Sequence, residues 1–285
     1  MSDTLQPLAP ILAADRFSAL GRELIALLRS LSDEQWRLST VASRWTVKDV
    51  AAHLLDTACR RLSIERDRFA PPAPVRPLDG YVELVGFLND LNAQWVTAFR
   101  RLSPRLLTDF LEHVEAPHAE LMLSVDPWGP ALFPVSWAGE EESLAWFDVA
   151  RELTERWHHQ QQIRLAVGAP PLDDPWISEP IFDTFLRALP HSYRNVTTAP
   201  AGTALTVQIE GQKTYAYTLQ MRENTGWILL AGEAAAPETR IILSEESAWL
   251  LFTKGLRGKE GRRRARIEGN PTLAAKFFET LAVMA

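Results

Sequence analysis

The sequence predicts an α+β protein of two domains, a helical one at residues 1–168 and an α+β one at residues 176–285. Apolar residues recur with helical spacing throughout the first part and alternate with polar residues in the second. Between them lies GAPPLDDPW, whose three prolines in nine residues are typical of a linker. A chain of 285 residues fits about two domains of ordinary size, so each part is long enough to bury its own core.

Helical periodicity in the first part predicts helices at about residues 14–31, 46–62, 81–102, 105–123 and 143–167. The second of these opens at Thr46, which can cap the helix together with Asp49 three residues on. The segment VDPWGPALFP breaks the helical pattern because proline and glycine recur in it. The last helix ends at Gly168, a residue suited to the position after a helix.

The second part begins with a predicted helix at 180–189 and continues with period-2 segments. Leu205, Val207 and Ile209 alternate with polar residues, the same pattern follows around residues 215–221, and GWILLAG and TRIILS come next. These segments predict strands of a half-covered antiparallel sheet. Helical character returns at 244–253 and 270–284, and the last helix is expected to be capped by Asn270.

Composition and charge exclude several classes of function. The net charge of −6 leaves no basic footprint for nucleic acid and disfavours attraction to anionic lipid. Because Cys59 is the single cysteine, neither an intramolecular disulfide nor a metal site made of thiolates is expected. The start of the sequence lacks a secretory signal, and no stretch approaches about 20 apolar residues, so a cytoplasmic location without membrane contact is expected.

The most informative stretch for chemistry is ELTERWHHQQQIR. Glu155 and His159 are four residues apart, so on a helix a carboxylate and an imidazole lie on one face and can reach one cation. A catalytic metal usually has three protein ligands and an open position. The best source of the third ligand is His53, in the middle of the predicted helix at 46–62.

Periodicity alone favours a different interpretation of the same stretch. A polar stripe faces away from Trp146, Leu153 and Trp157, and such a stripe is typical of a solvated helix surface. Its members are Asp148, Glu152, Glu155, His159 and Gln162. A single histidine within a helix, such as His53, is also more often structural than a ligand.

The paired motifs carry a resemblance to a known family. RWTVKDVAAHLLD, followed a hundred residues later by ARELTERWHHQQQIR, resembles the mycothiol-dependent maleylpyruvate isomerases, within the wider DinB/YfiT-like group. The W-x-x-x-D-x-x-x-H pattern of that family is met by Trp45, Asp49 and His53, and its E-x-x-x-H pattern by Glu155 and His159. The C-terminal part is similar to the family's second domain, notably in AWLLFTKGL and the closing helix.

The resemblance implies a fold, a metal site and a reaction. It implies a DinB-like four-helix bundle followed by a sterol-carrier-protein-like α+β domain. His53, Glu155 and His159 would hold one divalent metal, zinc first, with nickel or iron as alternatives. The activity would be that of an isomerase or S-transferase that uses a low-molecular-weight thiol such as mycothiol or bacillithiol on a small acidic substrate. Thiolate addition to a double bond would permit rotation before elimination.

Several points stay open at the level of sequence. Many relatives carry an aspartate where this chain has Gln162, and His158 also lies within a turn of Glu155. The catalytic arginine of the family matches Arg222, Arg240 or Arg266 equally well, so neither a catalytic nor a cofactor-binding residue is assigned. A metal-dependent hydrolase and a non-enzymatic binder of apolar ligands with a vestigial metal site are the alternatives. The substrate, the thiol, the native metal and the oligomeric state do not follow from the sequence.

Overall fold

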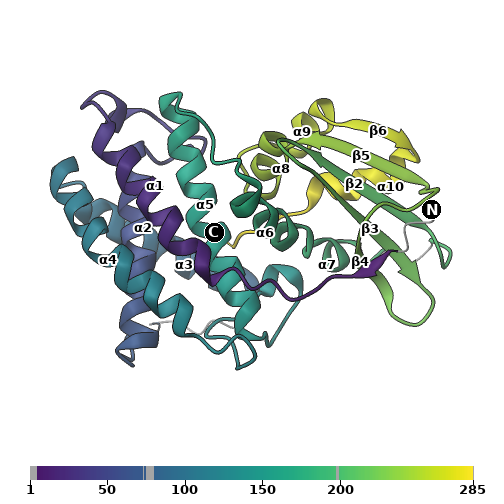
Figure 1. The fold of residues 1–285 in the computed structure, drawn as a ribbon, viewed down its shortest axis with the longest axis horizontal. Coiled ribbons are helices and arrows are strands. Elements are labelled where there is room, and N and C mark those ends of the chain that lie inside the picture. Colours follow the sequence, from purple (N-terminus) through teal and green to yellow (C-terminus); the bar gives the residue numbers. More distant parts are fainter. Residues whose placement is uncertain (1–4, 73, 75–79, 197–198, 285) are drawn as a thin grey trace.

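A computed structural model describes residues 5–72, 74, 80–196 and 199–284. Helices occupy one side of the molecule and a sheet the other, with shorter helices between them (Figure 1). The helical region comprises α1 (Phe17–Ser30), α2 (Val47–Arg61), α3 (Tyr81–Phe99), α4 (Pro104–Ser124) and α5 (Ala145–Val167). The second part contains α6 (Pro175–Leu186), α7 (Leu189–Tyr193), α8 (Glu245–Phe252), α9 (Gly258–Arg264) and α10 (Pro271–Ala275). The α+β fold class predicted from the sequence is confirmed.

Short helical turns extend or connect these helices: η1 (Ala14–Arg16), η2 (Gln35–Arg37), η3 (Leu62–Arg66), η4 (Ser136–Ala138) and η5 (Lys276–Glu279). Among the described residues, no helix is both long enough and apolar enough to span a lipid bilayer.

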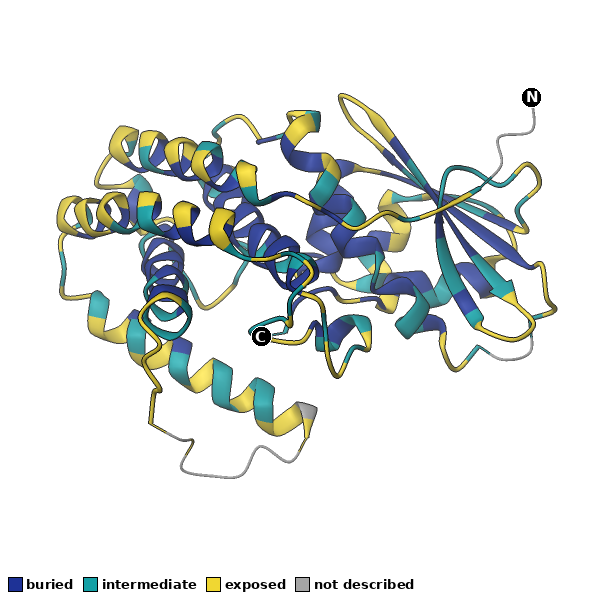
Figure 2. Cartoon of the chain, turned by 60° about the horizontal axis from the view of Figure 1, so that its bottom comes forward, coloured by how far each residue is buried: buried dark blue, intermediate teal, exposed yellow. Residues whose placement is uncertain are grey.

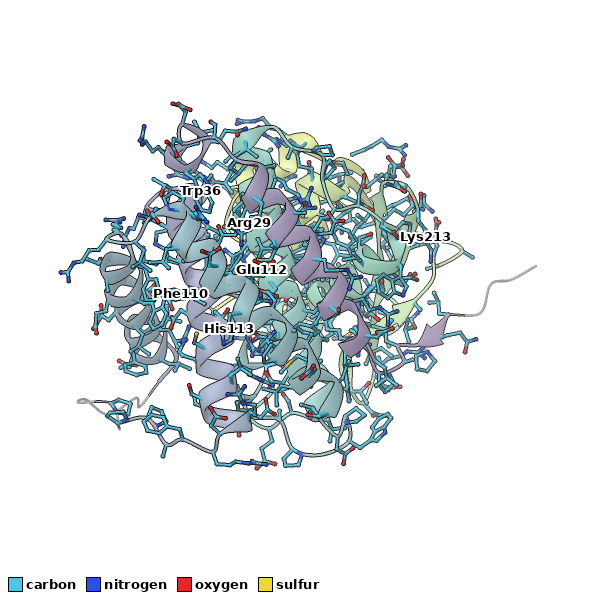
Figure 3. All side chains as sticks on the ribbon, turned by 60° about the vertical axis from the view of Figure 1, so that its left-hand side comes forward. Arg29, Trp36, Phe110, Glu112, His113 and Lys213 are labelled. Carbon is cyan, nitrogen blue, oxygen red and sulfur yellow. The ribbon has the colours of Figure 1, made fainter. Side chains whose placement is uncertain are left out.

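The centre of the helical region is α5, which packs against α1, α2 and α6. Figure 2 shows α2 and α5 buried along most of their length, whereas α3, which packs on α2, is largely exposed or half-buried. On the outer side, Arg29 of α1 faces α4 and pairs with Asp109 and Glu112 (Figure 3). The central position of α5 places any functional group on it inside the protein.

Local sequence explains how the two central helices begin and end. Thr46 caps α2 in a capping box in which its side chain accepts from the Asp49 backbone N–H, while the Asp49 carboxylate accepts from the Thr46 N–H. This agrees with the cap predicted from the sequence. Gly168 ends α5 in the left-handed conformation, at φ 68°, as its position after the helix requires.

The sheet differs from the predicted antiparallel one. Its strands are β1 (Gln6–Pro7), β2 (Ala204–Glu210), β3 (Thr214–Arg222), β4 (Gly226–Ala231), β5 (Thr239–Ser244) and β6 (Arg266–Gly269). In the described residues their order is β1-β4-β3-β2-β5-β6, and β2 and β5 pair in parallel. Alternation identifies a strand but not its neighbour, because the chain between β4 and β5 crosses over to the far side of β2.

The end of the chain also departs from expectation. Asn270 caps α10 as predicted, but the helix ends at Ala275 and η5 at Glu279, so the helix predicted to reach 284 is too long. Beyond it, the Ala282 N–H donates to the carbonyl of Phe252, and the tail runs back toward the helical region (Figure 1). The carbonyl of Met284 then accepts a hydrogen bond from Lys254.

The two parts of the chain share buried surface. Strand β1, at the start of the chain, pairs with β4 of the sheet (Figure 1). Trp157 of α5 packs edge-on against Phe182 of α6 and Trp249 of α8, with ring centroids 6.0 and 6.3 Å apart. One apolar cluster therefore continues from the helical region into the second part, and the domain boundary at 168–176 stays a prediction.

Candidate metal centre

The three residues singled out in the sequence come from the two central helices. His53 lies two turns into α2, and Glu155 and His159 lie one turn apart near the middle of α5. Because α2 packs against α5, the three side chains are directed at one another. The buried apolar face of α2, which packs against α5, thus fixes the position of His53.

The distances between the three side chains suit a metal ion. Glu155 Oε1 lies 3.3 Å from His53 Nε2 and 3.1 Å from His159 Nε2, and the three ligand atoms all lie within 4.8 Å of one another. In a tetrahedral zinc site with bonds of about 2.0–2.1 Å, neighbouring ligand atoms are about 3.3 Å apart. Two imidazole nitrogens and one carboxylate oxygen also form a donor set that zinc accepts.

The hydrogen bond on the far side of His159 provides a separate reason for a cation. Gln162 Oε1 lies 2.9 Å from His159 Nδ1, and because an amide oxygen only accepts, the Nδ1 atom carries the proton. In the neutral ring Nε2 then presents a lone pair to the Glu155 carboxylate oxygen. Two acceptors that face each other at 3.1 Å require a positive charge, a proton or a metal ion, between them. The residues therefore fit a bound metal.

Burial sets the charge states at the centre. The side chains of His53 and Glu155 are 3% and 25% exposed. Burial lowers the pKa of His53 to about 4, against the effect of its contact with Glu155, so the ring is neutral, as a metal ligand must be. Burial alone would raise the pKa of Glu155, but its contacts with His159 and His53 hold that pKa well below its usual value.

His158 is turned to a different partner. Its Nδ1 donates to the carbonyl of Thr154, 2.9 Å away, and the cluster of potential ligands comprises His53, Glu155 and His159 without it. Burial lowers the pKa of His158 to about 3, so this ring is neutral. The structure thus supports the register in which His159, rather than its neighbour, faces Glu155.

Comparison with known proteins gives the family. Residues 17–164, more than half of the chain, match the model of the mycothiol maleylpyruvate isomerase N-terminal domain. The chain belongs to this family. No curated protein matches the sequence.

One solved structure supports the fold, and two others are similar over part or most of the chain at lower TM-scores. A mycothiol-dependent maleylpyruvate isomerase carrying a histidine-to-alanine substitution superposes with a TM-score of 0.51 at 14% identity, over 90% of this chain and 93% of that one. Another crystal structure of a mycothiol-dependent maleylpyruvate isomerase gives 0.48 at 14% identity, over 84% and 88% of the chains. Sterol carrier protein 2 from Yarrowia lipolytica gives 0.28 at 16% identity, over 38% of this chain and 91% of that one.

The polar stripe of α5 in this family member is buried, so the solvated-surface interpretation of it is wrong. Asp148, Glu152, His159 and Gln162 are between 0% and 6% exposed. Their charges are compensated by partners from inside the helical region: Asp148 pairs with Arg61 at 2.8 Å and with Arg151 at 2.6 Å. Periodicity could not reveal this, because α5 is covered by other elements on its polar side as well as on its apolar side.

The indole ring of Trp45 covers one side of the centre. The ring of Trp45 lies 4.8 Å from that of His53 and 5.9 Å from that of His159, measured between centroids. Trp45 precedes the cap of α2, so the same turn that starts the helix also covers two of the candidate ligands. This ring reduces the access of water to the centre.

The second part of the chain contributes a cation that the sequence reasoning missed. Partial burial lowers the pKa of Lys254, and the negative charge of Glu155 raises it. Lys254 follows α8 in a left-handed conformation, at φ 65°. Next to it, a Cβ on Gly255 would lie 3.5 Å from Val41 Cγ2, so this turn rests on the segment before Trp45.

The three arginines considered from the sequence lie elsewhere. Arg240 pairs with Glu233 and Glu268, Arg266 also pairs with Glu268, and Arg222 ends β3 at an exposed position. Lys254 lies in the FTKGL segment, directly after α8. The sequence offers one local signal for the left-handed turn at Lys254: a lysine directly before a glycine at the end of a helix.

Proposed function

We propose that this protein is a metal-dependent isomerase or S-transferase that uses a low-molecular-weight thiol, with a small unsaturated carboxylate such as maleylpyruvate as its substrate. The observation that carries the proposal is the convergence of His53, Glu155 and His159 at distances that suit one metal ion. Membership in the mycothiol maleylpyruvate isomerase family supplies the reaction type.

His53, Glu155 and His159 would hold the metal and leave a coordination position for an external donor. A divalent ion of this kind lowers the pKa of a coordinating thiol, so that a thiolate is available at neutral pH. The thiol must come from outside the chain. Cys59 lies six residues after His53 on α2, and burial raises the pKa of its thiol, which makes it a poor nucleophile.

The proposed reaction conserves the composition of the substrate. The thiolate forms a carbon–sulfur bond to one carbon of the carbon–carbon double bond. The π electron pair of that double bond moves into the adjacent carbonyl system. Rotation about the new single bond follows. Elimination then breaks the carbon–sulfur bond and restores the double bond in the trans geometry. No oxidant or reductant is consumed, and the thiol is regenerated.

Within the chain, Lys254 would bind the substrate carboxylate. Its Nζ donates to a neutral backbone carbonyl, that of Met284, and the negative charge of Glu155 raises its pKa against the effect of partial burial. Its left-handed backbone is a strained conformation of the kind that is maintained at functional sites. Trp45 would limit the access of water to the thiolate.

Calorimetry on zinc-loaded protein tests the thiol requirement. Mycothiol, bacillithiol, glutathione and coenzyme A are titrated in turn, and at least one thiol is expected to bind. Binding should be lost in His53→Ala and Glu155→Gln, with the fold checked by circular dichroism. Zinc-loaded protein that binds none of the four thiols but hydrolyses an ester or amide would instead establish a metal hydrolase.

A substitution at Lys254 tests the substrate class. Lys254→Gln is expected to raise KM for a maleyl-type substrate by about 10–100-fold, because a charged hydrogen bond contributes about 1.5–3 kcal/mol, while thiol binding stays unchanged. Lys213→Gln is the matched control, since Lys213 lies on the side of the sheet (Figure 3) and pairs with Glu179 at 2.8 Å. Equal changes in KM for the two substitutions would show that Lys254 does not bind the substrate.

A further inference from the structure

The two candidate histidine ligands differ in the hydrogen bonding of Nδ1, the ring nitrogen that does not face Glu155. His159 Nδ1 is hydrogen-bonded to Gln162 Oε1 at 2.9 Å, and Gln162 is 3% exposed. His53 Nδ1 is equally enclosed but has no hydrogen-bond partner among the described residues. A ring held by packing alone can rotate or exchange tautomers more readily than one fixed by a hydrogen bond. Of the two histidine rings, His159 is thus the one whose outer nitrogen is held by a hydrogen bond, and Gln162 provides it.

We propose that Gln162 is a positioning residue that fixes the ring and the tautomer of His159 so that Nε2 faces the metal. The assignment rests on the proposed metal centre. In metal sites the partner of the second imidazole nitrogen orients the ring and adjusts its basicity, and loss of that partner typically costs 10–100-fold in metal affinity. Gln162 occupies that place by geometry, one helical turn after the ligand.

The neutrality of Gln162 has a chemical consequence. A carboxylate in this place would draw the Nδ1 proton and make Nε2 a stronger donor, which would reduce the positive charge at the metal. An amide oxygen orients the ring without that effect. The metal then keeps more of its ability to lower the pKa of a coordinating thiol, the role that the proposed function requires.

The chain provides its own controls in the run of three glutamines. Gln160 Nε2 donates to the carbonyl of Leu20 at 3.0 Å. Gln161 Nε2 donates to the carbonyl of Leu172, and Gln161 Oε1 accepts from the Leu172 N–H. Gln160 is fully buried, so its replacement removes an amide from the same helix at the same depth. Of these three glutamines, Gln162 is the one whose side chain is hydrogen-bonded to a candidate ligand.

The experiment compares Gln162→Met, Gln162→Glu and Gln160→Met. Zinc affinity is measured by competition with a chelator, the ligand field by the visible absorption of the Co²⁺ form, and the fold by thermal unfolding of the metal-free protein. Gln162→Met should lower zinc affinity 10–100-fold and shift the Co²⁺ bands. Gln162→Glu keeps a hydrogen-bond acceptor at this position and should retain the wild-type zinc affinity. Gln160→Met should change the zinc affinity less than threefold.

The outcomes separate this proposal from the proposed function. If Gln162→Met keeps the wild-type affinity and Co²⁺ spectrum, or if Gln160→Met loses as much affinity, Gln162 has no positioning role. Wild-type protein that binds zinc as expected but no thiol would overturn the thiol-dependent function and leave the role of Gln162 standing. Failure of the wild type to bind either metal would overturn both.

Discussion

Glu245 is a carboxylic acid in surroundings that favour its neutral form. It opens α8 and is 9% exposed, and its side chain packs so closely on Gly211 that a Cβ there would lie 2.3 Å from the carboxyl carbon. Burial, assisted by the charge of Asp173, raises the pKa of Glu245 to about 7. Its Oε1 atom has no hydrogen-bond partner among the described residues. The ionised form is therefore poorly stabilised in the folded protein.

This residue makes stability depend on pH in a defined direction. The folded pKa of about 7 exceeds the ordinary value of 4.5, so the folded protein binds the proton more tightly than the unfolded chain. Stability from this group is fully present below pH 4.5 and is lost as the pH rises to about 7. Glu245→Gln should raise the free energy of unfolding by about 1–2 kcal/mol at pH 8 and leave it nearly unchanged near pH 4.5.

Urea unfolding at the two pH values measures the effect. The control is Glu246→Gln, because Glu246 is adjacent on α8, its side chain is 56% exposed and it pairs with Arg264 at 3.6 Å across the surface. Its effect should be the same at both pH values. A Glu245→Gln variant that is destabilised more at pH 8 than near pH 4.5 would show instead that the carboxyl is ionised and stabilising.

At the scale of single residues, the sequence predicted those candidate ligands whose residue type and spacing form a recognisable motif. His53, Glu155 and His159 could be named because helical spacing and the family motifs mark them. Lys254 could not, because its relation to Glu155 arises only when α8 packs near α5. The place of Gln162 behind His159 follows from spacing, but its burial does not.

At the scale of elements, the start of α2 offers a direct test of whether a local capping motif stabilises the fold without affecting the centre. The Thr46 side chain accepts a hydrogen bond from the Asp49 N–H at 3.3 Å, and Asp49 is further held by Arg100 at 2.9 Å. Thr46→Ala should lower the free energy of unfolding by about 1 kcal/mol, the usual cost of a lost cap. Zinc affinity should stay unchanged, because His53 lies two turns further along the helix.

Denaturant unfolding with and without zinc provides the measurement for this prediction. Thr57→Ala is the matched control on the same helix, since the Thr57 hydroxyl donates to the carbonyl of Leu54 and caps nothing. Its effect should be within about 0.5 kcal/mol of zero. A cap variant as stable as the wild type would mean that tertiary packing alone fixes the start of α2.

Helices were easier to predict than the sheet because their signals are local. The bounds of α2 and α5 follow from caps and periodicity within the segment itself. Strand pairing depends on distant segments: nothing within β5 indicates that it pairs with β2 in parallel. β1, with only Gln6 and Pro7, is too short to show alternation. The tail after Glu279 leaves the helical path because its residues pack on α8.

At the scale of the whole molecule, the proposed centre lies where the two parts of the chain meet. α2 and α5 supply the candidate ligands, and the turn after α8 supplies Lys254. Across this boundary Trp157 is fully buried between the two parts, with Trp249 on the far side. The linker at 168–176 marks a change of secondary structure, but the apolar cluster continues past it.

A continuous core predicts that the protein unfolds as one unit. Separation of the two parts would expose Trp157 and its neighbours to water, at a cost of about 1.5–3 kcal/mol for each large side chain. Neither part should therefore remain folded once the other has unfolded. Differential scanning calorimetry of the full chain should show a single transition whose calorimetric and van't Hoff enthalpies agree.

Trp157→Ala adds a second measurement to this prediction. The substitution should lower Tm while keeping the single transition, because the cavity lies in a core that both parts share. Circular dichroism in the far ultraviolet, dominated by the helices, and fluorescence of the remaining tryptophans should then give the same midpoint. Two separate transitions in the wild type, or midpoints that differ between the probes, would mean that residues 1–168 and 176–285 are independent domains that only touch.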